Sequence, residues 1–278
     1  MNALHGFLNG VTATVMRPFT ALPAWVGLVA ASLVFGVIAA VAFRYTSPQA
    51  SLRRVADQIR ANLLSMRLFK DDMWITFKAQ GALLRAAALR LLYSLPPLAV
   101  MLAPFVFLAA QLAMYYEFRP LAPGETARVD MQALPQHWND VSAAELTAPD
   151  GIKVEAVVRD PAAHTITWRF RAERETGPQR LVWRLGSGAA VDKAVVVRGD
   201  AGRIEFVSPV RAGPSFWDRL LYPGEPAFDR DSPVQRIAVA YASRTTPIFG
   251  LNVHWIITLV VVSILGAFLV KPFMKVQF

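Results

Sequence analysis

The side chains that could carry out chemistry are scattered along the sequence, without the spacing of a catalytic or metal-binding motif. His137 and His164 lie among carboxylates, but not in an H-E-x-x-H pattern. The Gly-Ser-Gly sequence at 186–188 is typical of a hairpin turn, and Asp229 and Asp231 are as typical of a solvated loop as of paired catalytic acids. Because the chain has no cysteine, thiol chemistry and disulfides are excluded. We therefore expect a protein that is not an enzyme and holds no metal or other cofactor.

Polar side chains within apolar stretches are better functional candidates, because polar groups are costly inside a bilayer and persist there for a reason. The candidates of this kind are Arg44, Ser32, Gln111 and Ser263. Gln111 is also typical of a residue that hydrogen-bonds a neighbouring helix.

Three nearly uncharged runs must position these residues. They are Leu22 to Phe43, Leu95 to Tyr116 and Gly250 to Val270, each of 21 or 22 residues. A helix of about 20 residues crosses the hydrocarbon core of a bilayer. The first run is longer than the apolar core of a signal peptide and follows only one basic residue, Arg17, so we expect a retained anchor. The sequence therefore predicts a membrane protein with three transmembrane helices.

The charge distribution predicts the orientation of these helices. Residues 44–92 hold nine basic and three acidic residues, whereas residues 119–247 hold 17 basic and 16 acidic residues. Short basic loops remain in the cytoplasm, and Lys271 and Lys275 follow the last run. We expect a cell (inner) membrane protein with its N-terminus outside, residues 44–92 inside, the 119–247 region outside and its C-terminus in the cytoplasm.

The cytoplasmic segment is predicted to form a helical hairpin of coiled-coil type. One apolar seam comprises Leu52, Val55, Ile59, Leu63 and Met66, and a second comprises Phe77, Gly81, Leu84, Ala88 and Leu91. Residues 69–72 could form the turn, with Asp72 capping the second helix. One continuous helix, or a helix lying on anionic lipid, would fit the same pattern.

Basic side chains on this segment could contact anionic lipid or a cytoplasmic partner. They are Arg53, Arg54, Arg60, Arg67, Lys70, Lys78, Arg85 and Arg90. Lipid headgroups would account for them without a further partner, and ribosomal RNA or an acidic protein is the alternative. Specific DNA binding is not expected.

The remaining segments differ in character. Residues 1–21 carry apolar residues at helical spacing, as in an amphipathic helix on the outer membrane surface, although a frayed tail is also compatible. Alternating apolar residues at 152–158, 166–170 and 181–185 predict strands, and shorter strands are expected at 194–197, 204–207 and 237–241. We expect an antiparallel β-sandwich of the immunoglobulin-like type.

The predicted organisation is therefore an interfacial segment, three helices, a hairpin and a β-rich domain in alternation. The boundaries are 1–21 for the interfacial segment, 22–43 for helix 1, 44–93 for the hairpin, 94–117 for helix 2, 118–248 for the β-rich domain, 249–270 for helix 3 and 271–278 for the tail.

The order of parts in residues 22–118 and 250–275 resembles the core of the Oxa1 superfamily, of the YidC type. The resemblance is carried by the topology, the seam from Leu52 to Met66, and the sequence Tyr93-Ser94-Leu95-Pro96-Pro97 at the start of the second run. It implies a membrane-protein insertase or membrane chaperone, with a partly hydrated groove between the three helices that opens to the cytoplasm. Arg44, Ser32, Gln111 and Ser263 would contact an apolar client there. Nascent membrane proteins or the ribosome would then be partners, besides membrane lipids.

Two other functions fit the sequence. The chain could be a non-catalytic accessory subunit of a larger membrane complex, with the β-domain docking other subunits outside the membrane. It could also be a sensor that binds a ligand outside and signals through the hairpin, although no output domain is recognisable.

Overall fold

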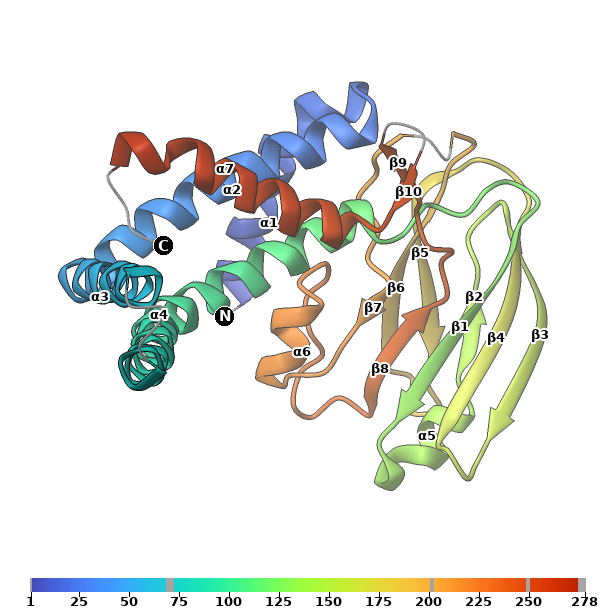
Figure 1. The fold of residues 1–278 in the computed structure, drawn as a ribbon. Helices are drawn as coiled ribbons and strands as arrows, with labels where there is room; N and C mark the ends of the chain where they lie inside the picture. Colours follow the sequence, from blue (N-terminus) through green and yellow to red (C-terminus); the bar gives the residue numbers. More distant parts are fainter. Residues whose placement is uncertain (1, 69–72, 201–202, 249–250, 275–278) are drawn as a thin grey trace. The chain divides into compact units, whose positions relative to one another are not determined.

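The computed structural model describes residues 2–68, 73–200, 203–248 and 251–274. The chain divides into two compact units. The first contains residues 1–28 and 106–256, and the second contains residues 29–105 and 257–278. Figure 1 shows the strands of the first unit and the long helices of the second.

Three helices are long and apolar enough to cross a membrane, as the sequence predicts. The helices of the chain are α1 (Asn2–Met16), the short 3₁₀ helix η1 (Arg17–Ala21), α2 (Ala24–Thr46), α3 (Gln49–Leu68), α4 (Met73–Tyr116) and α7 (Trp255–Met274). Candidate spans lie within α2, α4 and α7. The helical alternative for residues 1–21 is confirmed, because α1 and η1 occupy nearly all of that segment.

The second half of the predicted hairpin and the second predicted span form a single helix, α4, of 44 residues. Pro96, Pro97 and Pro104 lie inside it. A proline removes one backbone donor and kinks a helix. Inside a bilayer the backbone groups beside a proline have no water to bond with. A continuous helix satisfies most of them internally, which explains why α4 continues through the prolines. In Figure 1 the hairpin part of α4 is seen end-on and the next part runs across the view, so the helix bends.

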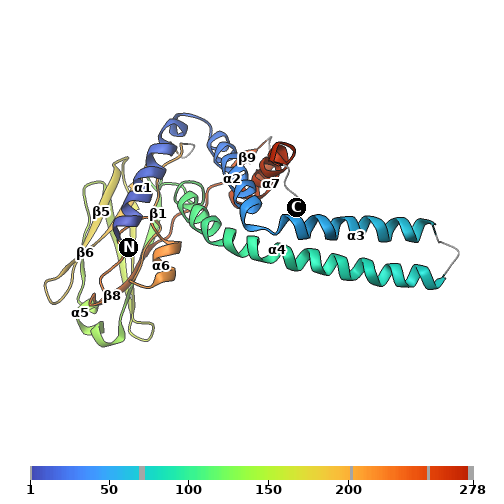
Figure 2. The same cartoon turned by 90° about the vertical axis from the view of Figure 1, so that its left-hand side faces the viewer.

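The hairpin itself forms, with α3 and the first part of α4 side by side and antiparallel (Figure 2). On α3, Leu52 and Val55 of the predicted seam are buried, but Leu63 is exposed. The second predicted seam is wrong, because its large members Phe77, Leu84 and Leu91 are all exposed. Ala79 and Ala86 are buried instead. Small side chains allow close approach of two helices, which explains why alanines occupy the buried positions. The predicted turn at 69–72 and its cap, Asp72, lie outside the described residues.

The third predicted span begins later in the structure than the sequence predicts. Residues 251–253 form strand β10, which pairs with β9 (Thr246–Ile248) in a two-stranded sheet. Helix α7 begins only at Trp255. The apolar residues Leu251 and Val253 extend the hydrophobic run in the sequence, but they pair as a strand and do not add to the helix.

The β-rich part of the first unit consists of two antiparallel sheets. One has the order β3-β4-β1-β8-β7 and the other β2-β5-β6. The strands are β1 (Thr126–Ala133), β2 (Glu145–Thr147), β3 (Ile152–Asp160), β4 (Thr165–Ala172), β5 (Gly177–Arg184), β6 (Ala190–Val197), β7 (Val210–Arg211) and β8 (Val234–Val239). This order is not the ABED and CFG arrangement of immunoglobulin domains, so an immunoglobulin-like fold is not confirmed.

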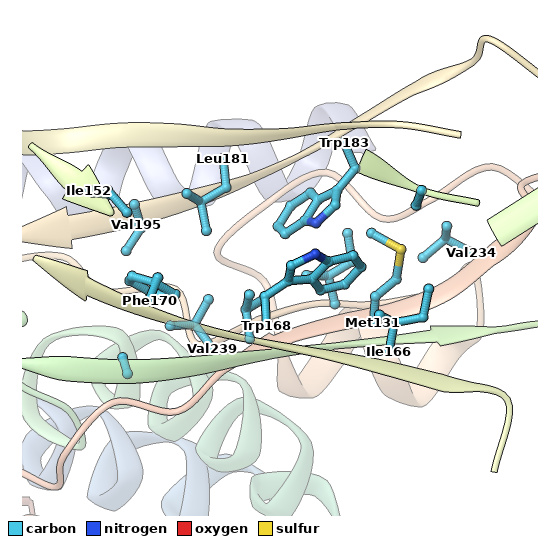
Figure 3. Close-up of a cluster of buried hydrophobic side chains, with 14 of the residues drawn as sticks. Met131, Ile152, Ile166, Trp168, Phe170, Leu181, Trp183, Val195, Val234 and Val239 are labelled. Atoms are coloured by element: carbon cyan, nitrogen blue, oxygen red, sulfur yellow. The ribbon is translucent and has the colours of Figure 1, made fainter. Parts of the chain in front are cut away.

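The core of this part lies between the two sheets, and Figure 3 shows its side chains. Trp168 of β4 and Trp183 of β5 face each other, with ring centroids 5.5 Å apart and ring planes inclined by 56°. Both indoles are fully buried, and burial of large aromatic surfaces is a major source of stability. The two sheets therefore pack as a sandwich.

One predicted strand does not form. Residues 204–207 have no strand structure, although Ile204 and Val207 are buried. The backbone N–H of Val207 donates to the carbonyl of Met114, in the last turn of α4, at 2.7 Å. The segment therefore covers a helix end, and its alternating apolar residues serve that packing and not a sheet.

A buried ion pair stabilises one edge of the smaller sheet. Lys193 on β6 has no exposed surface, and its Nζ donates to the Glu225 carboxylate at 2.5 Å and to the Ser208 carbonyl at 2.6 Å. Burial lowers the pKa of Lys193 from its ordinary value, and the Glu225 carboxylate opposes that shift. The other Glu225 carboxylate oxygen accepts from the backbone N–H of Ala194, so the carboxylate also caps part of the β6 edge.

Candidate functional site

An apolar cavity in the helical unit is the best candidate for a functional site. Its volume is about 420 Å³, within the range of pockets that bind small molecules. Three spans line it. The lining residues are Phe35, Ala39, Ala40 and Phe43 from α2, Leu98, Met101, Leu102 and Phe105 from α4, and Val260, Ser263, Ile264 and Ala267 from α7.

Close packing of α2 and α7 forms one wall of the cavity. A Cβ atom added to Gly36 would lie 2.1 Å from the backbone oxygen of Ser263, and one added to Gly266 would lie 3.1 Å from the oxygen of Leu33. Only glycine therefore fits at position 36 without movement of the α7 backbone. Small residues at such contacts are the usual means of packing helices in a membrane.

A contact between aromatic rings joins α2 to α4 at the same cavity. The rings of Phe35 and Phe105 have centroids 5.5 Å apart and planes inclined by 50°. Phe105 directly follows Pro104, where a kink is expected to displace the helix axis. The small side chains of Ala39 and Ala40 leave space next to this aromatic pair.

The chemistry of the lining is almost entirely hydrophobic. Among the residues described, no charged side chain lines the cavity, and Ser263 is its polar member. The Ser263 hydroxyl donates to the Val260 carbonyl in its own helix at 2.9 Å, so its hydrogen is already used. The cavity can therefore hold an alkyl chain or an apolar polypeptide segment, and it offers no general acid or base.

The four predicted groove residues do not gather in one place. Ser263 lines the cavity, whereas Ser32 is buried in α2 but is not among the lining residues. Arg44 is exposed in the last turn of α2, with its guanidinium 5.9 Å from the centroid of the Tyr45 ring. Gln111 belongs to the other unit, where its Nε2 donates to Asn9 of α1 at 2.9 Å. The interpretation of Gln111 as a partner for a neighbouring helix is therefore confirmed.

The basic side chains of the hairpin that the structure describes are mostly exposed. Arg53, Arg54, Arg60, Lys78 and Arg85 are exposed, and Arg90 is half-buried. Arg60 approaches Asp57 at 3.5 Å in an exposed pair, which contributes little to stability. The side chain of Arg67 and all of Lys70 lie outside what the structure describes.

The end of the hairpin also exposes large apolar side chains. They are Leu64 and Leu68 on α3 and Met73, Trp74 and Phe77 on α4. Phe77 was predicted to be part of an apolar seam, and its exposure contradicts that prediction. These side chains lie close in sequence to residues 69–72, where the chain passes from α3 to α4.

Within residues 2–68, 73–200, 203–248 and 251–274, no three His, Asp or Glu side chains gather in a way that could hold a metal ion. Comparison of the chain with protein-family models, with curated protein sequences and with solved structures gives no match.

Proposed function

We propose that the chain is a membrane-protein insertase or membrane chaperone of the Oxa1 type, which holds apolar client segments in the cavity between α2, α4 and α7. The observation that carries this proposal is the cavity itself, with hydrophobic side chains from all three spans. A transmembrane segment of a client is a continuous run of mainly apolar residues such as Leu, Val, Ile and Phe, and these side chains gain dispersion contacts with an apolar wall.

The cavity is hydrophobic, unlike the partly hydrated groove that the resemblance implies. Because the described lining carries no charge, the cavity would shelter the apolar part of a client and would leave its polar flank to other surfaces. The exposed basic side chains of the hairpin, such as Arg53 and Arg54, are suited to a nascent chain on the ribosome or to anionic lipid.

The proposed setting is the inner membrane of a cell, with the hairpin in the cytoplasm and the β-rich part outside. Nine basic residues against three acidic ones in residues 44–92 support this orientation. The proposed partners are membrane lipids and newly made membrane proteins.

Site-specific photocrosslinking would test the function. A benzoylphenylalanine at Met101 or Ile264 would replace a lining residue, and one at the exposed neighbours Val100 or Leu265 would point away from the cavity. We expect crosslinks from 101 and 264 to several newly synthesised membrane proteins, and severalfold fewer from 100 and 265. Equal crosslinking at lining and control positions, or capture of one constant partner only, would contradict the proposal.

The second candidate is an accessory subunit whose β-rich part docks other proteins. The edge of β3 favours it, because β3 is a nine-residue edge strand and its residues 156–160 are all exposed. Unpaired edges accept an added strand. Loss of a stoichiometric companion from the purified complex on Val158→Pro substitution, but not on Ala189→Pro substitution in a turn of the smaller sheet, would support this function.

A further inference from the structure

Helix α6 (Phe216–Leu221), which lies within the β-rich sequence, has an unusual surface. Phe216, Trp217 and Leu221 are 58%, 66% and 47% exposed, and the two aromatic rings pack edge to face with centroids 5.3 Å apart. None of the six residues of the helix is buried. Three large apolar side chains on a single short helix are more than the scattered exposure expected on a soluble surface.

A contact of α1 indicates the depth at which the neighbouring elements lie. Asn9 of α1 accepts a hydrogen bond from Gln111, which lies five residues before Tyr116 at the end of α4. At 1.5 Å per residue, Gln111 is about 7–8 Å inside the end of this span. The interfacial zone on each side of the hydrocarbon core has a similar thickness. A span that ends at the outer edge of this zone would place the middle of α1 at the level of the interface.

The first residue of α7 lies beside the end of α4. Trp255, the first residue of α7, donates from its indole nitrogen to the carboxylate of Glu117, which follows α4 directly. Two candidate spans therefore end at the same level within the first unit, where the side chains of Trp255, Tyr115 and Tyr116 are buried.

Asn9 also connects this level to α6. Its Nδ2 donates to the carbonyl of Pro223, two residues beyond the end of α6, at 2.7 Å. A small cavity of about 120 Å³ between the two elements is lined by Gly6 and Asn9 of α1 and by Arg219 and Tyr222 at the end of α6, among others. In Figures 1 and 2 alike, α6 lies beside the N-terminal end of α1.

We propose that α6 is a membrane-contacting element, and that Phe216, Trp217 and Leu221 insert into the interfacial region of the bilayer beside α1. The side chains match this location, because an indole and a phenyl ring gain from the boundary between headgroups and acyl chains. On α1, Val11 and Val15 are exposed and would contribute to the same surface. The spans tether α6 near the bilayer, so a small apolar area is sufficient for insertion. This inference rests on the spans and not on the insertase function.

Depth measurement by electron paramagnetic resonance would test the proposal. Because the chain has no cysteine, single cysteines at Trp217 and Leu221 can be spin-labelled in the full chain, reconstituted in phosphatidylcholine and phosphatidylglycerol nanodiscs. Val158 on β3, which is 62% exposed, is the matched control in the same unit. We expect labels at 217 and 221 to collide severalfold more with oxygen than with a water-soluble nickel chelate, and the label at 158 to show the reverse.

Two outcomes would overturn the inference. Labels at 217 and 221 that collide with nickel as often as the label at 158 would place α6 in water. Labels shielded from both reagents would mean that protein, such as a second copy of the chain, covers α6. A label at Phe216 keeps Trp217 in place, so agreement between positions 216 and 221 excludes an effect of removing the tryptophan.

Discussion

The carboxamide of Gln111 donates a hydrogen bond of 2.9 Å to the side-chain oxygen of Asn9, which is 102 residues away in the sequence. Gln111 is buried in α4, and Asn9 passes the connection on to the carbonyl of Pro223. The Nε2 of a polar residue within a candidate span thereby finds its acceptor on α1, a helix that is not among the candidate spans. We infer that α1 is held in place by this network and not only by contact with lipid.

A double-mutant cycle would measure the strength of this connection. Asn9→Ala and Gln111→Ala should each destabilise the full chain by about 1 kcal/mol, the usual net value of one such hydrogen bond. The double variant should be less destabilised than the sum of the two, because the lost bond is the same one. Thermal unfolding in mild detergent gives the measurement. Strict additivity of the two effects would contradict a direct interaction.

Substitution of alanine for Gly36 and for Gly81 should have opposite effects on the stability of the protein. Gly36→Ala would place a methyl group 2.1 Å from the Ser263 carbonyl oxygen, so we expect destabilisation of roughly 1–3 kcal/mol from overpacking. Gly81→Ala in α4 meets nothing within 4 Å and should raise stability by up to about 1 kcal/mol through helix propensity. Comparison of the two melting temperatures checks the packing of α2 against α7. A neutral Gly36→Ala variant would mean that these helices are farther apart.

Filling the cavity should block client contact. Ala39→Trp introduces a large side chain into the lining of α2, whereas Ile38→Trp adds one on an exposed face of the same helix. We expect Ala39→Trp to reduce crosslinking from position 101 severalfold and to leave the amount of protein in the membrane unchanged. Ile38→Trp should have no effect on crosslinking. If both variants crosslink like the wild type, the cavity does not hold the client.

Acid should weaken the first unit through Glu125. The Arg119 guanidinium donates to the Glu125 carboxylate at 2.7 and 2.9 Å and lowers the pKa of that carboxyl below its ordinary value. A carboxyl with a lowered folded-state pKa stabilises the fold above the unfolded pKa of about 4.3, and this contribution is lost as the pH falls through the lower folded value.

The measurement compares wild type with Glu125→Gln between pH 3 and pH 7. The wild type should be the more stable of the two at pH 7, and the difference should shrink below about pH 4.3. Glu145→Gln, at an exposed carboxylate of the same unit with no resolved ion pair among the described contacts, is the control. A difference that stays constant across the range would show that Glu125 contributes by shape and not by charge.

Single-cysteine labelling would test the orientation. Gln58→Cys lies on an exposed face of α3, and Ala189→Cys lies in an exposed turn before β6. A maleimide that cannot cross membranes should label intact cells at 189, and should label position 58 only after the cells are opened. Labelling of position 58 in intact cells would reverse the predicted topology and remove the basis for a cytoplasmic hairpin.

The sequence alone determined the spans, the hairpin and the β-rich part, because each depends on a local pattern. Runs of about 20 apolar residues, apolar seams at steps of three and four, and strict alternation in residues 166–170 are visible without any long-range contact. The central strand β1 was missed. Two of its buried positions, Ala127 and Ala133, carry only a small alanine side chain, so the apolar alternation is weak.

The tertiary structure decided the pairing of α2 with α7, the cavity and the exposure of Trp217, because these features depend on which surfaces meet. The pairing of α2 with α7 depends on Gly36 lying opposite the Ser263 backbone, which no local pattern specifies. The cavity forms where Ala39 and Ala40 of α2 meet apolar side chains of α4 and α7, and Arg44 is left outside it. The exposure of Trp217 is likewise a property of the folded chain, since the sequence shows an apolar residue but not whether anything covers it.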